Sequence, residues 1–235
     1  MDLAANFGDI RQRIQGACAR AGREPTSVTL VAVSKGHPPE VVRAAVELGQ
    51  AVFGESRVQE ARVKIEQCSG PLRWHLIGHL QSNKCREAVS LFEMIQSMDS
   101  LALGEEVSKW AEKEAKTMPV LLEVNVAGEA TKFGFKPAQL PSVLSQINAL
   151  PKIEIHGLMT IAPWTPDPEK VRHVFQQLRE LREESEQILG APLAHLSMGM
   201  SGDFEVAIEE GATLVRIGAG LFGPRAKARK EPASF

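Results

Sequence analysis

The sequence predicts a (β/α)8 barrel, a closed sheet of eight parallel strands, preceded by one extra helix. Short apolar or β-branched runs alternate with amphipathic helical stretches along the chain, an order typical of repeated strand–helix units. Glycine or proline separates successive runs. The length of 235 residues suits a barrel that folds as one unit.

The elements follow one another in a regular order. An N-terminal helix is predicted from an apolar stripe that ends at Gly22. Its members are Phe7, Ile10, Ile14, Ala17, Cys18 and Ala21. Strands are then predicted at Val28–Ser34, Ala51–Gly54, Arg73–Ile77, Met94–Met98, Val120–Val126, Ile153–Met159, Leu193–Ser197 and Thr213–Ile217. Helical stripes lie between strands, for example Leu140, Val143, Leu144 and Ile147, or Val171, Val174, Phe175, Leu178 and Leu181.

Strands separated by helices imply parallel pairing through right-handed crossovers. Runs such as VTLVAV are apolar on both faces, as expected for strands covered by helices. We predict closure into a barrel, with an open doubly wound sheet as the alternative. Because no linker or break in composition divides the chain, residues 1–235 are predicted to form a single domain. We expect Trp74, Met94 and Met159 in the core or the wall of a pocket.

The composition argues against several classes of partner. Lys and Arg (27) nearly balance Asp and Glu (29), and the net charge of −2 gives no field that favours nucleic acid or an anionic membrane. No apolar run approaches the ~20 residues that span a bilayer, and the N-terminus lacks a secretion signal. The basic tail RAKARKEPASF is too short to suggest nucleic-acid binding.

Cysteine usage points to a reducing compartment. Cys18, Cys68 and Cys85 are widely spaced and form no C-x-x-C pair, so we predict free thiols and a cytoplasmic protein. The histidines lack the spacing of a metal site, and no H-E-x-x-H motif occurs. Since no apolar stripe is left over after the barrel helices are assigned, we expect a monomer.

Function in this fold collects at the carboxyl ends of the strands. The first predicted strand runs into AVSKGHPP, which puts Lys35 at such an end. Loss of part of its ammonium hydration would favour the neutral amine that imine formation requires. The alternative, which is more common for a single lysine, is a side chain with its head group in solvent.

Two later segments offer a phosphate site and a cation. In LSMGMSGDFEVAI, Ser201 is predicted to begin a helix whose free amides favour a phosphate, and plain capping of that helix is the alternative. In LVRIGAGLFG, the last strand carries Arg216 and is followed by Gly218 and Gly220, in the usual phosphate-binding region of this fold. A buried arginine needs an acceptor, so an internal salt bridge is the alternative to a ligand.

These three segments meet if the barrel closes. The first and last strands are then neighbours, and Lys35 and Arg216 face the same ligand. An amine, a phosphate cradle and a cation at one end of a barrel suit pyridoxal 5′-phosphate (PLP). In this hypothesis Lys35 forms an imine, the last two loops bind the phosphate, and Arg216 meets the ring nitrogen.

The stretches LVAVSKGHP, FGESRVQE, WHLIGHLQSNK, EVNVAGEATKFGF, IHGLMTIAP and LSMGMSGDFEVAIEEGATLVRIGAGLFGPR cover much of the chain. With them the sequence resembles the pyridoxal phosphate homeostasis protein family, single-domain relatives of the alanine racemase N-terminal barrel. The resemblance implies a cofactor site made of Lys35, Ser201, Gly202, Arg216, Gly218 and Ala219. It also implies that the protein binds, buffers and delivers PLP to apo PLP-dependent enzymes in vitamin B6 homeostasis, without an established turnover.

Three positions depart from the family pattern. The family commonly has Lys-Thr-Lys-Pro where this chain has Lys-Gly-His-Pro at 35–38, so a second nearby lysine is missing. Ser56 and Arg57 stand where Asn-Tyr is common, which removes an expected asparagine hydrogen bond. Ala219 stands where a hydroxyl residue is usual, so the phosphate would rely more on backbone amides. We expect weaker cofactor binding, not its loss.

Three functions compete: a PLP carrier, a PLP-dependent amino-acid racemase, and an interaction barrel without a ligand. Alanine racemases use a tyrosine as the second proton donor, whereas this sequence contains none, and it lacks their additional β domain. Arg216 beside the ring nitrogen would also weaken the electron sink that racemisation needs. We therefore predict the carrier. His79 could replace the missing base, although a solvated or hydrogen-bonded loop histidine is the commoner case. Lys132 is expected at the surface.

Overall fold

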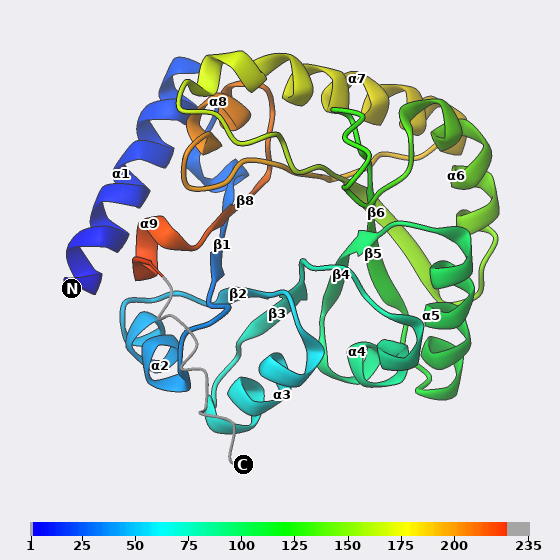
Figure 1. Cartoon of the computed structure of the whole chain (residues 1–235), viewed down its shortest axis with the longest axis horizontal. Helices are drawn as coiled ribbons and strands as arrows, with labels where there is room; N and C mark the ends of the chain where they lie inside the picture. The colour runs from blue at the N-terminus through cyan, green and yellow to red at the C-terminus, as the bar shows by residue number, and fades with distance from the viewer. Residues whose placement is uncertain (1, 225–235) are drawn as a thin grey trace, which may run out of the picture.

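The computed structural model describes residues 2–224, and these form a closed barrel of parallel strands surrounded by helices (Figure 1). The strands pair in chain order, and the eighth pairs with the first. The predicted barrel is therefore confirmed, and the alternative of an open sheet is wrong. The tail RAKARKEPASF lies outside the described residues.

All eight strands lie where the sequence predicted them, with ends that shift by a few residues. They are β1 (Thr29–Val33), β2 (Val52–Glu55), β3 (Arg73–Leu76), β4 (Met94–Met98), β5 (Met118–Glu123), β6 (Ile153–Met159), β7 (His195–Ser197) and β8 (Leu214–Ile217). Helices cover the outer face of this sheet, as parallel strands with buried faces require.

The helices are α1 (Leu3–Arg20), α2 (Pro39–Glu47), α3 (Val58–Gln67), α4 (Cys85–Leu91), α5 (Leu101–Lys113), α6 (Leu140–Asn148), α7 (Arg172–Leu189), α8 (Phe204–Glu209) and α9 (Ala219–Phe222). Short 3-10 helices occur at η1 (Pro25–Ser27), η2 (Ser82–Lys84), η3 (Pro137–Gln139) and η4 (Pro168–Val171). None of the helices in this part of the chain is both long and apolar enough to cross a membrane.

The extra N-terminal helix is α1. The Asp2 carboxylate caps its first turn by accepting a hydrogen bond from the amide of Ala5, which satisfies one of the free N–H groups there. The helix ends at Arg20, just before Gly22, whose backbone is left-handed (φ +65°). Its buried stripe packs against α8 and α9, at the left edge of Figure 1. α1 therefore covers the segments that follow β7 and β8.

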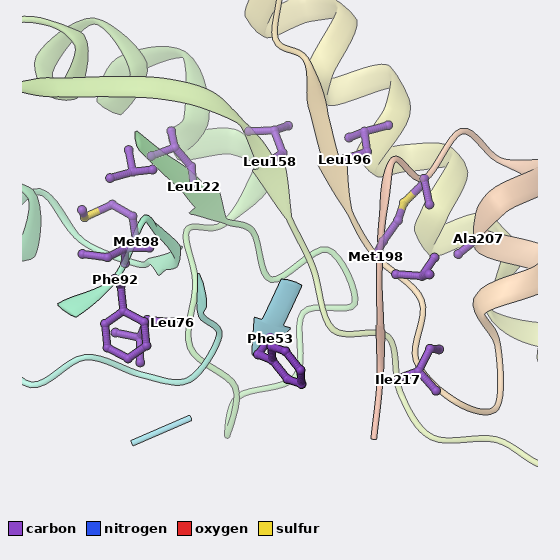
Figure 2. Packing of buried hydrophobic residues seen from close by; sticks show 14 of the residues in the cluster. Phe53, Leu76, Phe92, Met98, Leu122, Leu158, Leu196, Met198, Ala207 and Ile217 are labelled. Atoms are coloured by element: carbon purple, nitrogen blue, oxygen red, sulfur yellow. The ribbon is translucent and has the colours of Figure 1, made fainter. Parts of the chain in front are cut away.

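Hydrophobic packing occurs on both faces of the sheet. A large cluster fills the space between the strands and the helices, and Figure 2 shows part of it, with Leu122, Leu158 and Leu196 from three successive strands. A smaller cluster fills the barrel interior, and its members are Val31, Val52, Met94, Leu121, Met159 and Leu214. Trp74 belongs to the outer cluster and stacks on Phe53. The expectation that Trp74, Met94 and Met159 are core residues is confirmed.

The structure also tests the predictions for the cysteines and for a metal site. Cys18, Cys68 and Cys85 are buried free thiols, as predicted. Among residues 2–224, no group of three or more His, Cys, Asp or Glu side chains could hold a metal ion.

Gly157 should be essential to the pairing of β6 with β7. In Gly157→Ala the new β-carbon would lie 1.9 Å from the carbonyl oxygen of His195, its partner on β7. We expect the free energy of unfolding to fall by about 3 kcal/mol, as for other severe packing defects, in equilibrium urea unfolding. Gly8→Ala on α1 is the control, because its β-carbon meets nothing within 4 Å and alanine favours a helix by up to about 1 kcal/mol. Equal effects of the two substitutions would contradict this account.

Candidate functional site

A cavity of about 410 Å³ opens at the carboxyl ends of β1, β7 and β8, within the usual size range of small-molecule sites. Its lining includes all the residues predicted to bind the cofactor, namely Lys35, Ser201, Gly202, Arg216, Gly218 and Ala219. The fold therefore brings the six together from three separate parts of the chain. Their roles toward a ligand stay predictions.

Lys35 occupies a tight turn directly after β1. The amide of His37 donates to the carbonyl oxygen of Ser34 at 3.0 Å, and Gly36 has a left-handed backbone (φ +77°). A glycine with positive φ at the third position is typical of a type II turn. The glycine that replaces the family's usual threonine is thus suited to its position, and the turn directs the partly buried Lys35 to the cavity.

Arg216 lies inside the barrel, on β8, and is only 4% exposed. Its guanidinium donates to the hydroxyl of Ser197 at 2.6 Å and to the carbonyl oxygen of Thr160 at 2.8 Å. Within the described residues no carboxylate lies at ion-pair distance, so an internal salt bridge is not what holds Arg216. Burial lowers the pKa of Arg216 to about 10, against the charges of Glu123 and Asp203. The group therefore stays cationic at neutral pH while only neutral atoms hold it.

A chain of hydrogen-bonded, buried polar side chains continues from Arg216 across the barrel. The Ser197 hydroxyl donates to the Gln96 side-chain oxygen at 2.6 Å, and the Gln96 nitrogen lies 2.8 Å from Nδ1 of His75. Burial lowers the pKa of His75 to about 4, so its ring is neutral and Nδ1 accepts from Gln96. Because the one hydroxyl proton of Ser197 goes to Gln96, Ser197 can only accept from Arg216.

Ser197, Gln96 and His75 were not predicted as part of the site. The available signal was a polar residue at an inward-facing position of an otherwise apolar strand, as in MIQSM. Such a residue needs a hydrogen-bond partner once it is buried. The partners come from β3, β4, β7 and β8, and only the closed barrel identifies them.

Ser201 differs from its predicted setting. The helix expected to begin there, α8, begins at Phe204, and the amide of Met200 donates to the Asp203 carboxylate at 2.6 Å. The Ser201 hydroxyl instead accepts a hydrogen bond from the amide of Gly220, at 3.2 Å, on α9. Capping of α8 by Ser201 is therefore wrong. Ser201 joins the loops after β7 and β8, and its hydroxyl proton can point to a ligand.

Gly218 and Gly202, which both line the cavity, differ in how closely other atoms approach them. A β-carbon on Gly218 would lie 3.3 Å from the carbonyl oxygen of Val33, so the end of β8 passes close to the end of β1, beside Lys35. A β-carbon on Gly202 would meet nothing within 4 Å, so the backbone of the loop after β7 is open on that side. A bulky anion can therefore approach the amides of this loop.

Other residues considered from the sequence lie outside this cavity. His79 is hydrogen-bonded to the carboxylate of Asp99 at 2.7 Å, and its ring stacks on Phe133; it lines a neighbouring cavity together with Ser56. Lys132 is exposed at another hollow. The expectations of a hydrogen-bonded His79 and a surface Lys132 are confirmed. Neither side chain lines the cavity that contains Lys35.

Comparison with known proteins identifies the family. Residues 5–226 match the model of the alanine racemase N-terminal domain. The chain is 46% identical over 226 residues to the pyridoxal phosphate homeostasis protein of Aquifex aeolicus (strain VF5), which covers 96% of this chain and 99% of that protein. Identity to the protein of the same name from Pseudomonas aeruginosa is 42% over 224 residues, or 95% and 96% of the two chains.

A solved structure agrees with these relatives. PipY from Synechococcus elongatus PCC7942, described with PLP bound, is 38% identical and superposes with a TM-score of 0.83, over 94% of this chain and 100% of that one. The resemblance found in the sequence is thus confirmed. The chain belongs to the alanine racemase N-terminal domain family and, within it, to the pyridoxal phosphate homeostasis proteins.

Proposed function

We propose that this protein binds PLP as an imine on Lys35 and holds and delivers the cofactor in vitamin B6 homeostasis. The observation that carries the proposal is one cavity shared by the amine of Lys35 and the guanidinium of Arg216, which has no carboxylate partner among residues 2–224. The names of the relatives and the PLP described in PipY support the same ligand.

The donor set fits PLP group by group. Bound PLP would supply an aldehyde for an amine, a phosphate for N–H and O–H donors, and a ring nitrogen for a further donor. Lys35 is the amine. Ser201 and the backbone amides of Gly202, Gly218 and Ala219 would hold the phosphate, since successive backbone N–H groups form anion-binding concavities. Arg216 would donate to the ring nitrogen. Its hydrogen bonds within the protein go to neutral acceptors, the Ser197 hydroxyl and the Thr160 carbonyl oxygen, so its charge stays available to the ligand.

The same geometry favours a carrier over a racemase. A cationic donor at the ring nitrogen opposes protonation of that nitrogen, which weakens the electron sink. The chain has no tyrosine to act as a second proton donor, and His79, the possible substitute, is held by Asp99 and lines a different cavity. We therefore propose binding without catalytic turnover. An interaction barrel without a ligand is disfavoured, because the amine of Lys35, the hydroxyl of Ser201 and the guanidinium of Arg216 belong to residues that line one cavity.

The setting of this activity is also a proposal. Three buried free thiols suit a reducing compartment, so we propose the cytoplasm. Every residue assigned to PLP comes from one barrel in one chain, which suits a single-domain monomer. The recipients would be apo PLP-dependent enzymes.

Lys35→Ala should abolish covalent PLP binding, because among residues 2–224 no other amine lines the cavity. Wild-type protein mixed with PLP should show a visible imine absorption band, and borohydride should bleach it and fix the cofactor on Lys35, as read by peptide mass spectrometry. Lys132→Ala is the control and should keep the band. A band that persists in folded Lys35→Ala protein would show that the lysine is wrongly assigned.

Incubation with L-alanine separates the carrier from the racemase. We expect no accumulation of D-alanine by chiral chromatography. Sustained interconversion, lost in Lys35→Ala, would displace the carrier proposal. A colourless wild type that takes up no PLP would instead favour the interaction barrel.

Arg216→Glu should change the electronic state of the ring. A carboxylate in place of the guanidinium would favour a protonated ring nitrogen, so we expect a shifted imine absorption and slow side reactions with amino acids. Circular dichroism checks that the variant is folded. Arg216→Gln also removes the guanidinium but adds no buried negative charge, and its imine absorption is measured in the same way. An unchanged spectrum in both folded variants would mean that Arg216 does not touch the ring.

Ala219→Ser should tighten PLP binding about tenfold or more, because it restores a hydroxyl donor at an exposed position of the cavity. One hydrogen bond to a charged group contributes about 1.5 kcal/mol or more, and about 1.4 kcal/mol is tenfold in affinity. Ser201→Ala should weaken binding by a similar factor. Absorbance titration gives Kd for both, with the imine maximum unchanged. If neither Kd moves, these loops do not hold the phosphate.

A further inference from the structure

The FGESRVQE motif supplies two members of a buried ionic cluster that the cavity does not explain, and Lys64 is the third. Glu55 ends β2, Glu60 lies on the first turn of α3, and Lys64 follows one turn later. The ammonium of Lys64 lies 2.6 Å from Glu55, 2.7 Å from Glu60 and 2.7 Å from the carbonyl oxygen of Ser34. Lys64 is 2% exposed and Glu55 is 0% exposed. None of the three side chains lines the cavity of Lys35.

The cluster uses the full bonding capacity of one ammonium group. Lysine has three N–H donors and no acceptor, and each donor of Lys64 has a different acceptor. These acceptors come from the turn after β1, from β2 and from α3. A group bonded in three directions cannot shift without breaking a charge-assisted hydrogen bond. The cluster therefore fixes the turn relative to both neighbouring elements.

The contacts with the turn fall on both sides of Lys35. The peptide group before Lys35 is held through the carbonyl oxygen of Ser34, which accepts from Lys64. The peptide group after Lys35 is held through the amide of Gly36, which donates to Glu60 at 2.5 Å. The Ser34 hydroxyl also donates to Glu55 at 2.6 Å. Both peptide groups that flank the α-carbon of Lys35 are thus tied to one buried cluster.

Stability alone is a poor reason for such an arrangement. Removing ionic groups from water is costly, and replacing them by apolar residues of similar volume often leaves a protein as stable or more so. The second carboxylate oxygen of Glu55 is buried without a hydrogen-bond partner among the described residues, which adds to this cost. A cluster of this kind is better explained by the geometry that it imposes.

We propose that Glu55, Glu60 and Lys64 form a lysine clamp, a set of positioning residues that holds the Ser34–His37 turn so that the amine of Lys35 points into the cavity. This inference rests on the proposed function. Gly36 is intrinsically flexible, so without the clamp the turn samples other conformations and the amine is misdirected. Misplacement of a reacting group by 1 Å can cost about 10²-fold in rate.

Lys64→Met tests the clamp, because methionine is similar in size and removes every donor. Two readouts are taken: hydrogen exchange of residues 34–38 in the apo protein, and the rate of imine formation with PLP followed by absorbance. We expect faster exchange at the Gly36 amide and imine formation slowed by about tenfold or more, within the range known for misplaced reacting groups.

Lys116→Met is the matched control. Lys116 is a half-buried lysine that also ties backbone carbonyls, those of Val89 and Phe92 at 2.7 and 2.6 Å. It precedes β5, at the end of the barrel opposite the cavity. This variant should lose stability in urea unfolding, yet keep the wild-type exchange of residues 34–38 and the wild-type rate.

Glu60 gives a second, milder pair of variants. Glu60→Ala removes the acceptor for Gly36 and should reproduce the effects of Lys64→Met, whereas Glu60→Gln keeps an oxygen and should restore most of the protection and rate. Because the Glu60 side chain is 28% exposed, Glu60→Ala carries the test if Lys64→Met does not fold. Folded variants with wild-type exchange and rate would overturn the clamp while the wild-type imine on Lys35 stands. A wild type that forms no imine would overturn the proposed function instead.

Discussion

The pairing of β1 with β8 is the contact on which the site depends. Four residue pairs align these strands, from Thr29 with Leu214 to Ala32 with Ile217, although the strands lie far apart in the sequence. Since Lys35 follows β1 and Gly218 follows β8 directly, closure of the barrel brings an amine and a set of backbone amides to one cavity. In an open sheet these strand ends would lie at different edges. The site is thus a consequence of closure.

Two buried cations near this cavity are stabilised in opposite ways, and the difference matters for function. Lys64 has two carboxylates and a carbonyl oxygen as acceptors, so its hydrogen bonds are all directed inside the protein. Arg216 has a hydroxyl and a carbonyl oxygen, both neutral, so its charge is available to a ligand. A planar guanidinium with five donors suits this role. The first cation holds backbone geometry, and the second keeps a charge that the cavity offers to a ligand.

Hydrophobic periodicity predicts the strands and the extra helix, and the strand ends point to Lys35, Ser201, Arg216 and Gly218, because these are local signals. Gly202 and Ala219 follow only from the family resemblance. Contacts across the barrel are not local. Gln96 and Ser197 are 101 positions apart and become partners only through closure. Lys64 looks like an ordinary helical lysine until α3 packs on β2 and brings its ammonium to Ser34. The start of α8 was misplaced because Asp203, two residues after Ser201, accepts the hydrogen bond from Met200 that fixes the turn.

A carrier must release its ligand, and this requirement explains why the departures from the family pattern are compatible with function. Affinity differences between related complexes are mostly differences in dissociation rate. In the proposed site, Ala219 removes one hydroxyl from the phosphate donors, whereas Glu60 and Lys64 still bind the turn that carries Lys35. With the proposed roles, weaker phosphate binding would hasten release without misdirecting the amine. In the proposed site, attachment and release are set at opposite ends of the ligand, so one can change while the other is kept.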